Sequence, residues 1–114
     1  MTLDKLIEAV EAGMLPAAVF HGCSGSRGHW AYDTGLGAEQ RKWVFLAYNG
    51  SLDATKALHD ALLPGWEWNI DAGDGAYVEN RGDFGAPYTA DIPGMPARAW
   101  LLAILKAKQA EERG

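Results

Sequence analysis

Hydrophobic residues recur at helical spacing in the first segment of the chain. From Leu3 to Met14 they stand at positions i, i+3, i+4, i+7 and i+11, and charged residues occupy the other side. Thr2 fits the N-cap position, and Gly13 suits the left-handed conformation that often ends a helix. The pattern predicts an amphipathic N-terminal helix.

The periodicity is lost between residues 21 and 37. Five of these 17 residues are glycine, and serine, aspartate and threonine lie among them. This composition predicts a long, flexible loop. Loops of this length are often functional, so the segment is a candidate location for a site.

Residues 38–63 predict two helices joined by a tight turn. Ser51 fits the N-cap of the second helix, and Gly50 fits the position just after the end of the first. Residues 42–48 would also suit a strand, with Asn49 and Gly50 closing a hairpin, so this segment stays open between helix and strand. Pro64 ends the second helix because the residue before a proline is pushed out of the helical region.

The period then changes to two. Trp66, Trp68 and Ile70 alternate with polar residues, which predicts a strand with one aromatic face. A second strand is expected over 76–79, after a loop of about five residues. Residues 87–91 form a candidate third strand, and its proline is confined to an edge strand or to the start of a strand.

The chain closes with the most hydrophobic helical segment. Pro96 suits the first turn of a helix, and residues 99–105 follow with no charged interruption. We therefore expect the most buried helix here, and we expect Trp100 to share a core with Trp66 and Trp68. The whole pattern predicts one α+β domain over residues 1–114: an N-terminal helix, a Gly-rich loop, two central helices, a two- or three-stranded antiparallel sheet and a buried C-terminal helix.

Composition and charge exclude several classes of protein. The 114 residues carry a net charge of −5, which is not the balance of a general nucleic-acid binder, so direct binding to nucleic acid is not expected. The longest strongly apolar run is far too short to span a membrane. The single Cys23 cannot form an internal disulfide, and no secretory signal is visible, so we expect a cytoplasmic protein.

The acidic residues are concentrated near the predicted hairpin. Residues 61–95 contain six carboxylates against one arginine, a net charge of −5 (−6 + 1), whereas residues 96–114 are net basic. Such a region is suited to a basic partner surface. Two aromatic residues in the loop are candidate anchors for the same kind of contact. The candidate partner-binding residues are Glu67, Asp71, Asp74, Glu79, Asp83, Trp30 and Tyr32.

The candidates for catalytic or metal chemistry are weak. His21, Cys23 and His29 form the only cluster of metal-type ligands, and they lack the second close pair that zinc sites use. A thiol nucleophile at Cys23 would need a histidine held and oriented within hydrogen-bond reach. The alternative interpretation is an ordinary polar loop with a free thiol, and no cofactor is predicted.

Several capping, stop and core positions resemble those of a known family. The runs 47–54 (AYNGSLDA) and 62–68 (LLPGWEW), together with 96–103 (PARAWLLA) and 2–6 (TLDKL), resemble the phage ABA sandwich domain over about two-thirds of the chain. The stretch 16–37 departs from the family pattern. The resemblance implies a phage or prophage accessory protein acting in a bacterial cytoplasm, and it carries over no catalytic residue.

We therefore expect a non-enzymatic protein that binds a host protein complex and modulates or inhibits it, for example a defence system such as CRISPR-Cas. One alternative is a small metal- or ligand-binding protein or enzyme that uses the loop with His21, Cys23 and His29. A second alternative is a structural or assembly component of a phage particle. The oligomeric state does not follow from the sequence.

Overall fold

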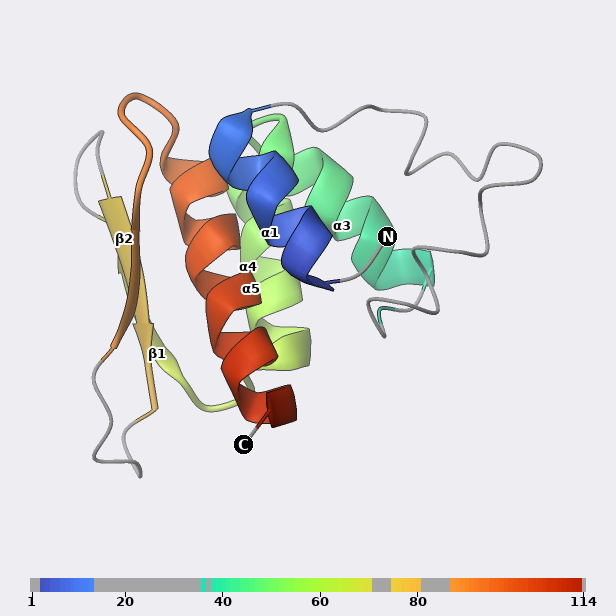
Figure 1. Ribbon diagram of the computed structural model, residues 1–114, viewed down its shortest axis with the longest axis vertical. Helices are drawn as coiled ribbons and strands as arrows, with labels where there is room; N and C mark the ends of the chain where they lie inside the picture. The colour runs from blue at the N-terminus through green and yellow to red at the C-terminus, as the bar shows by residue number, and fades with distance from the viewer. Residues whose placement is uncertain (1–2, 14–35, 37, 71–74, 81–86, 114) are drawn as a thin grey trace.

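The structure of the chain is a computed structural model, which describes residues 3–13, 36, 38–70, 75–80 and 87–113. Along the chain, the helices α1, α3 and α4 come first, the three strands follow, and helix α5 closes the chain (Figure 1). This is an α+β fold with an antiparallel sheet, as the sequence predicts. The elements in chain order are α1 (Leu3–Ala12), α3 (Ala38–Tyr48), α4 (Leu52–Leu62), β1 (Glu67–Ile70), β2 (Gly75–Glu79), β3 (Tyr88–Asp91) and α5 (Pro96–Arg113).

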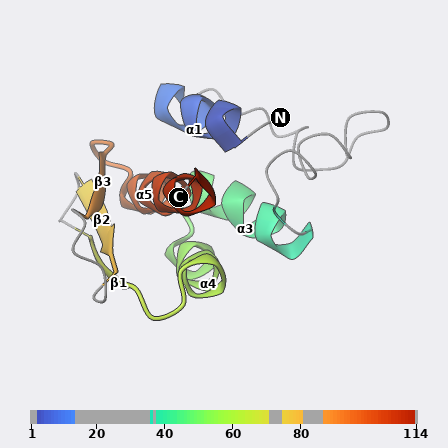
Figure 2. The same cartoon turned by 60° about the horizontal axis from the view of Figure 1, so that its bottom comes forward.

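Helix α5 lies at the centre of the molecule. Figure 2 shows it between the sheet on one side and α1, α3 and α4 on the others. Residues 99–105 of α5 are all buried, on every side of the helix. A helix that is apolar all round needs neighbours all round. The prediction that the last helix is the most buried is confirmed.

The sheet has the strand order β1-β2-β3, and both pairings are antiparallel. β1 ends at Ile70 and β2 begins at Gly75, so four residues separate the two strands, against about five expected. The third strand exists and lies at an edge, which is consistent with the proline before it.

The ambiguous segment 42–48 is helical and forms the second half of α3. The Gly50 N–H donates to the Ala47 carbonyl (3.0 Å) and the Ser51 N–H to the Leu46 carbonyl (2.9 Å), and Gly50 has a φ of +107°. These are the two hydrogen bonds of a Schellman motif. The Ser51 hydroxyl then accepts from the Ala54 N–H (3.1 Å) and caps α4. The turn is therefore a helix–helix joint and not a hairpin.

The expectation for the three tryptophans is only partly right. Trp100 is 2% exposed and belongs to the core, whereas Trp66 is half-buried and Trp68 is 40% exposed. The physical reason is the place of β1 at the sheet edge, because α5 packs mainly against β2 and β3. The inner side of β1 therefore extends beyond the cover that α5 provides.

Candidate functional site

The sheet has an inner face toward α5 and an outer face directed away from it. Val78 and Ala90 are buried, which assigns them to the inner face, and Trp68 stacks on Trp100 of α5 on the same face. Because side chains alternate along a strand, their neighbours lie on the other side. We call that side the outer face; it consists of Glu67, Asn69, Tyr77, Glu79, Thr89 and Asp91.

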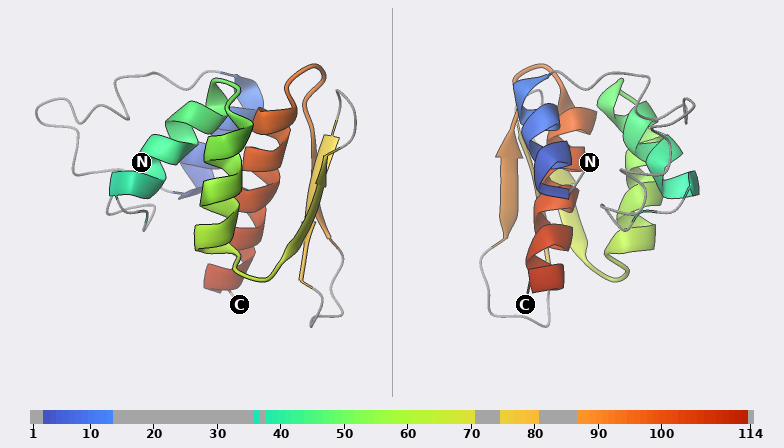
Figure 3. Two further views of the ribbon diagram at one scale, coloured as in Figure 1. Left: turned by 180° about the vertical axis from the view of Figure 1, so that it is seen from behind. Right: turned by 45° about the vertical axis from the view of Figure 1, so that its right-hand side comes forward.

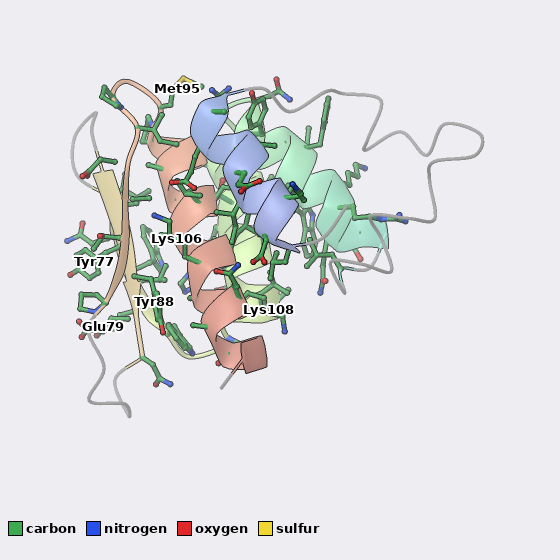
Figure 4. All side chains as sticks on the ribbon, viewed as in Figure 1. Tyr77, Glu79, Tyr88, Met95, Lys106 and Lys108 are labelled. Carbon is green, nitrogen blue, oxygen red and sulfur yellow. The ribbon has the colours of Figure 1, made fainter. Side chains whose placement is uncertain are left out.

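Figure 4 shows the two faces directly. The side chains of Tyr77 and Glu79 project from the side of β2 that faces away from α5, whereas Tyr88 lies between the sheet and the helix. No described helix or strand packs on the outer face (Figures 1 and 3). Its polar side chains are half-buried or exposed. The outer face is thus available to a partner over the part of the chain that the structure describes.

The outer face is acidic. Three of its six side chains are carboxylates, Glu67, Glu79 and Asp91, and none is basic. Glu67 and Glu79 are direct partners in the β1–β2 register. The register therefore brings two carboxylates to neighbouring positions of one face.

Asp91 occupies the other end of the outer face, beside Gly75. A Cβ atom built on Gly75 would collide with the Asp91 carboxylate, and it would stand 3.2 Å from the Ala90 carbonyl oxygen. The absence of a side chain at Gly75 therefore lets the Asp91 carboxylate lie over β2. The acidic side chains of the outer face thus come from all three strands.

The inner side of β1 carries a cluster of aromatic rings. Trp68 stacks on Trp100 with ring centroids 4.2 Å apart, and Trp66 lies 6.2 Å from Tyr88. The His59 ring of α4 meets the edge of Trp68 at 6.4 Å. The cluster joins β1 to α4 through His59 and to α5 through Trp100. Its member Trp68 is exposed at the sheet edge.

His59 is 2% exposed and satisfied at both ring nitrogens. The Trp100 indole N–H donates to His59 Nδ1 in a long contact of 3.4 Å, so His59 Nε2 carries the proton and donates to the Trp66 carbonyl at 3.0 Å. Burial lowers the pKa of His59 below its ordinary value of 6.5, against the smaller raising effect of the hydrogen bond to Trp66. His59 is therefore a neutral core residue, and no catalytic nucleophile is among the contacts described for it.

Two of the residues predicted for partner binding, Glu67 and Glu79, are described and lie together on the outer face. The other five lie outside the described residues: Asp71, Asp74, Asp83, Trp30 and Tyr32. The weak metal candidates His21, Cys23 and His29 lie outside them too, as does the segment 21–37. Among the residues that the structure describes, no three His, Cys, Asp or Glu side chains are grouped so that they could hold a metal ion.

The sequence-based list missed Tyr77, Asn69, Thr89 and Asp91 as members of the same surface. The period-two alternation could have identified Asn69 and Tyr77, because both are out of phase with the apolar positions of their strands. Asp91 could be assigned to this face only from the β2–β3 register, which depends on contacts between distant segments. The exposure of Trp68 also needed the strand order.

Comparisons with known proteins add no relative to this description. No protein-family model matches the chain, and neither a curated protein nor a solved structure does. The resemblance to the phage ABA sandwich domain therefore stays a prediction. Among the described helices, none is both long enough and apolar enough to cross a membrane.

Proposed function

We propose that the protein is a non-enzymatic binding protein that docks its acidic outer face on a basic surface of a protein partner. The observation that carries the proposal is the direct pairing of Glu67 with Glu79 on a face that no described helix or strand packs on. A basic surface would meet two neighbouring carboxylates at this place, and complementary charge of this kind raises the association rate and the specificity of binding.

The composition of the outer face suits such a contact. Tyr77 stands in the central strand between Asn69 of β1 and Thr89 of β3. A tyrosine buries a large area at a low entropic cost and is frequent among the residues that dominate binding energy. The surrounding carboxylates would steer a basic partner and set its orientation. The result is an aromatic centre with acidic side chains around it.

The setting that we propose is the cytoplasm of a bacterial host, where a phage or prophage accessory protein would modulate or inhibit a host complex such as a defence system. The resemblance to the phage ABA sandwich domain supports this setting. The outer face supports the binding role independently of it, since that argument rests on register and charge alone.

The test is affinity capture from a bacterial lysate with the immobilised chain, followed by mass spectrometry. The double variant Glu67→Gln, Glu79→Gln removes both opposed charges and keeps the side-chain shape. We expect the partner recovered by the unaltered chain to fall by about tenfold or more with this variant, since losing two complementary charges slows association. Raising the salt concentration should release the partner, because surface attraction is screened.

A matched control is Glu8→Gln, Glu11→Gln, which removes the same charge from exposed positions on α1. This control should retain the partner fully. Equal capture by the outer-face variant and the unaltered chain would refute the proposal, and equal losses in both variants would reduce it to an effect of net charge.

A further inference from the structure

We propose that β1, on its edge away from β2, binds an extended segment of the partner in which basic and apolar residues alternate, so that the segment becomes a fourth strand of the sheet. The inference rests on the proposed function and specifies what its partner presents. It depends on the strand order, on the exposure of Trp68 and on the charge of the outer face.

The two edges of the sheet differ. At β3 the ammonium of Lys106, from α5, donates to the Thr89 carbonyl oxygen at 3.4 Å (Figure 4 labels Lys106), so a backbone acceptor of that strand is already occupied. At β1, by contrast, no described strand pairs on the side away from β2. The left view of Figure 3 shows β1 at the near side of the sheet. Backbone groups of alternate residues in an edge strand point outward and can accept a further strand.

The alternation of β1 determines the chemistry of the added strand. A residue opposite Trp68 would lie on the inner face, with its Cβ about 4.5–5.5 Å from that of Trp68. It would cover the exposed part of the indole, so it should be apolar. The next position along would lie on the outer face, and opposite Glu67 it should be lysine or arginine. The same alternation holds for a parallel or an antiparallel segment.

Charge complementarity favours such a partner over a second copy of this chain. Two β1 strands paired about a twofold axis would join two outer faces into one sheet surface, and each would bring its own Glu67 and Glu79. Like-charge juxtaposition of this kind opposes association. A segment with basic residues at every second position would instead compensate the acidic face.

The test uses the full chain and short synthetic peptides, with dissociation constants from calorimetry. The first peptide alternates arginine and valine. The second has the same composition in two blocks, and the third is the alternating peptide with N-methyl groups on alternate backbone nitrogens. We expect the alternating peptide to bind, and the block and N-methylated peptides to bind about tenfold more weakly or worse, because each loses backbone pairing or register.

Trp68→Ala should weaken binding of the alternating peptide, whereas Leu52→Ala should not. Leu52 is a suitable control because it is a similarly exposed apolar residue, 45% exposed, on α4. The N-methylated peptide tests the same point with the unaltered chain, so an unfolded Trp68 variant would not leave the question open.

Equal binding of all three peptides would overturn the inference and leave the proposed function standing, since it would show charge attraction without strand addition. Absence of binding by the alternating peptide would also overturn it. If the chain forms a dimer and Trp68→Ala converts it to a monomer, the edge of β1 pairs with a second copy of this chain, and the inference is overturned. Failure of the proposed function is read separately, from lysate capture that the outer-face charges do not affect.

Discussion

At the scale of single residues, His59 shows how burial sets a protonation state. Its two ring nitrogens face one group that can only donate, the Trp100 indole N–H, and one that can only accept, the Trp66 carbonyl. Only the neutral ring with its proton on Nε2 satisfies both. Protonation would place a second donor against the indole N–H, and it would also put a charge in the core.

This arrangement predicts a pH-dependent stability. The pKa of His59 is lowered in the folded protein, so the unfolded chain binds more protons at mildly acidic pH. The contribution of neutral His59 to the free energy of unfolding is complete above pH 6.5, its unfolded pKa, and is lost as the pH falls toward the folded pKa. Urea unfolding between pH 5 and 8 measures it.

The comparison variant is His59→Gln, which is expected to be less stable than the unaltered chain at neutral pH but to lose less stability below pH 6.5. The other two histidines, His21 and His29, are the same in both proteins, so their contribution cancels in the difference. Parallel pH profiles for the two proteins would show that His59 does not carry the effect.

At the scale of the elements, the two faces of the sheet differ in character. The inner side is apolar and is covered mainly by α5. On the outer side Glu67 and Glu79 stand opposite each other. Alternation alone explains the polar character of that side, but it does not explain two carboxylates in register. The proposed binding role rests on this pairing.

A charge reversal at this pair should therefore stabilise the fold and weaken the function. With Glu79→Lys, a basic side chain faces Glu67, and we expect the free energy of unfolding to rise by about 0.2–1 kcal/mol. The gain should shrink in high salt because the pair is partly exposed. Denaturant unfolding at low and high salt measures the gain, and lysate capture measures the expected loss of partner.

Glu79→Gln serves as the intermediate case for the same experiment, since it removes the negative charge at this position without adding a positive one. A loss of stability on going from Glu79→Gln to Glu79→Lys would contradict the inferred register of the two side chains. A gain in stability with unchanged partner capture would show that the charge at position 79 affects the stability of the sheet and not binding.

At the scale of the whole molecule, Arg98 connects helices that are far apart in sequence. It lies in the first turns of α5, and its Nε and Nη2 donate to the Tyr48 carbonyl at the end of α3, at 3.1 and 3.0 Å. Its guanidinium also lies 3.8 Å from the centre of the Tyr48 ring. A Cβ atom at Gly13, just after α1, would stand 3.7 Å from its Nη1. Arg98 thus joins the start of α5 to the end of α3, close to the end of α1, with its charge at the C-terminal end of the α3 dipole.

We expect Arg98→Met to lower the free energy of unfolding by about 1.5–3 kcal/mol, the range for hydrogen bonds that involve a charged group. The free energy of unfolding of Arg98→Lys should lie between those of the unaltered chain and Arg98→Met, because lysine keeps the charge but loses the two-pronged geometry. Thermal or denaturant unfolding measures both. Lys42→Met, which removes an exposed positive charge from α3, is the control and should have little effect. Equal stability of Arg98→Met and the control would show that the junction is held by packing alone.

Much of this architecture follows from the sequence by itself, because the signals are local. Helical spacing predicts α1, α4 and α5, and period-two alternation predicts β1 and β2. Gly50 and Ser51 favour a helix–helix joint because only certain residues suit those backbone positions. The sequence also shows directly that acidic residues, among them Glu67 and Glu79, are concentrated around the strands.

Other features are decided only by tertiary structure, because they depend on contacts between distant segments. The segment 42–48 suits two periods equally, and it becomes helical as part of α3, which packs on α4 and α5. The edge position of β1 exposes Trp68, although its sequence is that of a core residue. Strand register places Glu67 opposite Glu79 and brings Asp91 to the same face. The sequence supplies the charges and the rings, and the packing of the sheet against α5 determines which of them meet and which reach the surface.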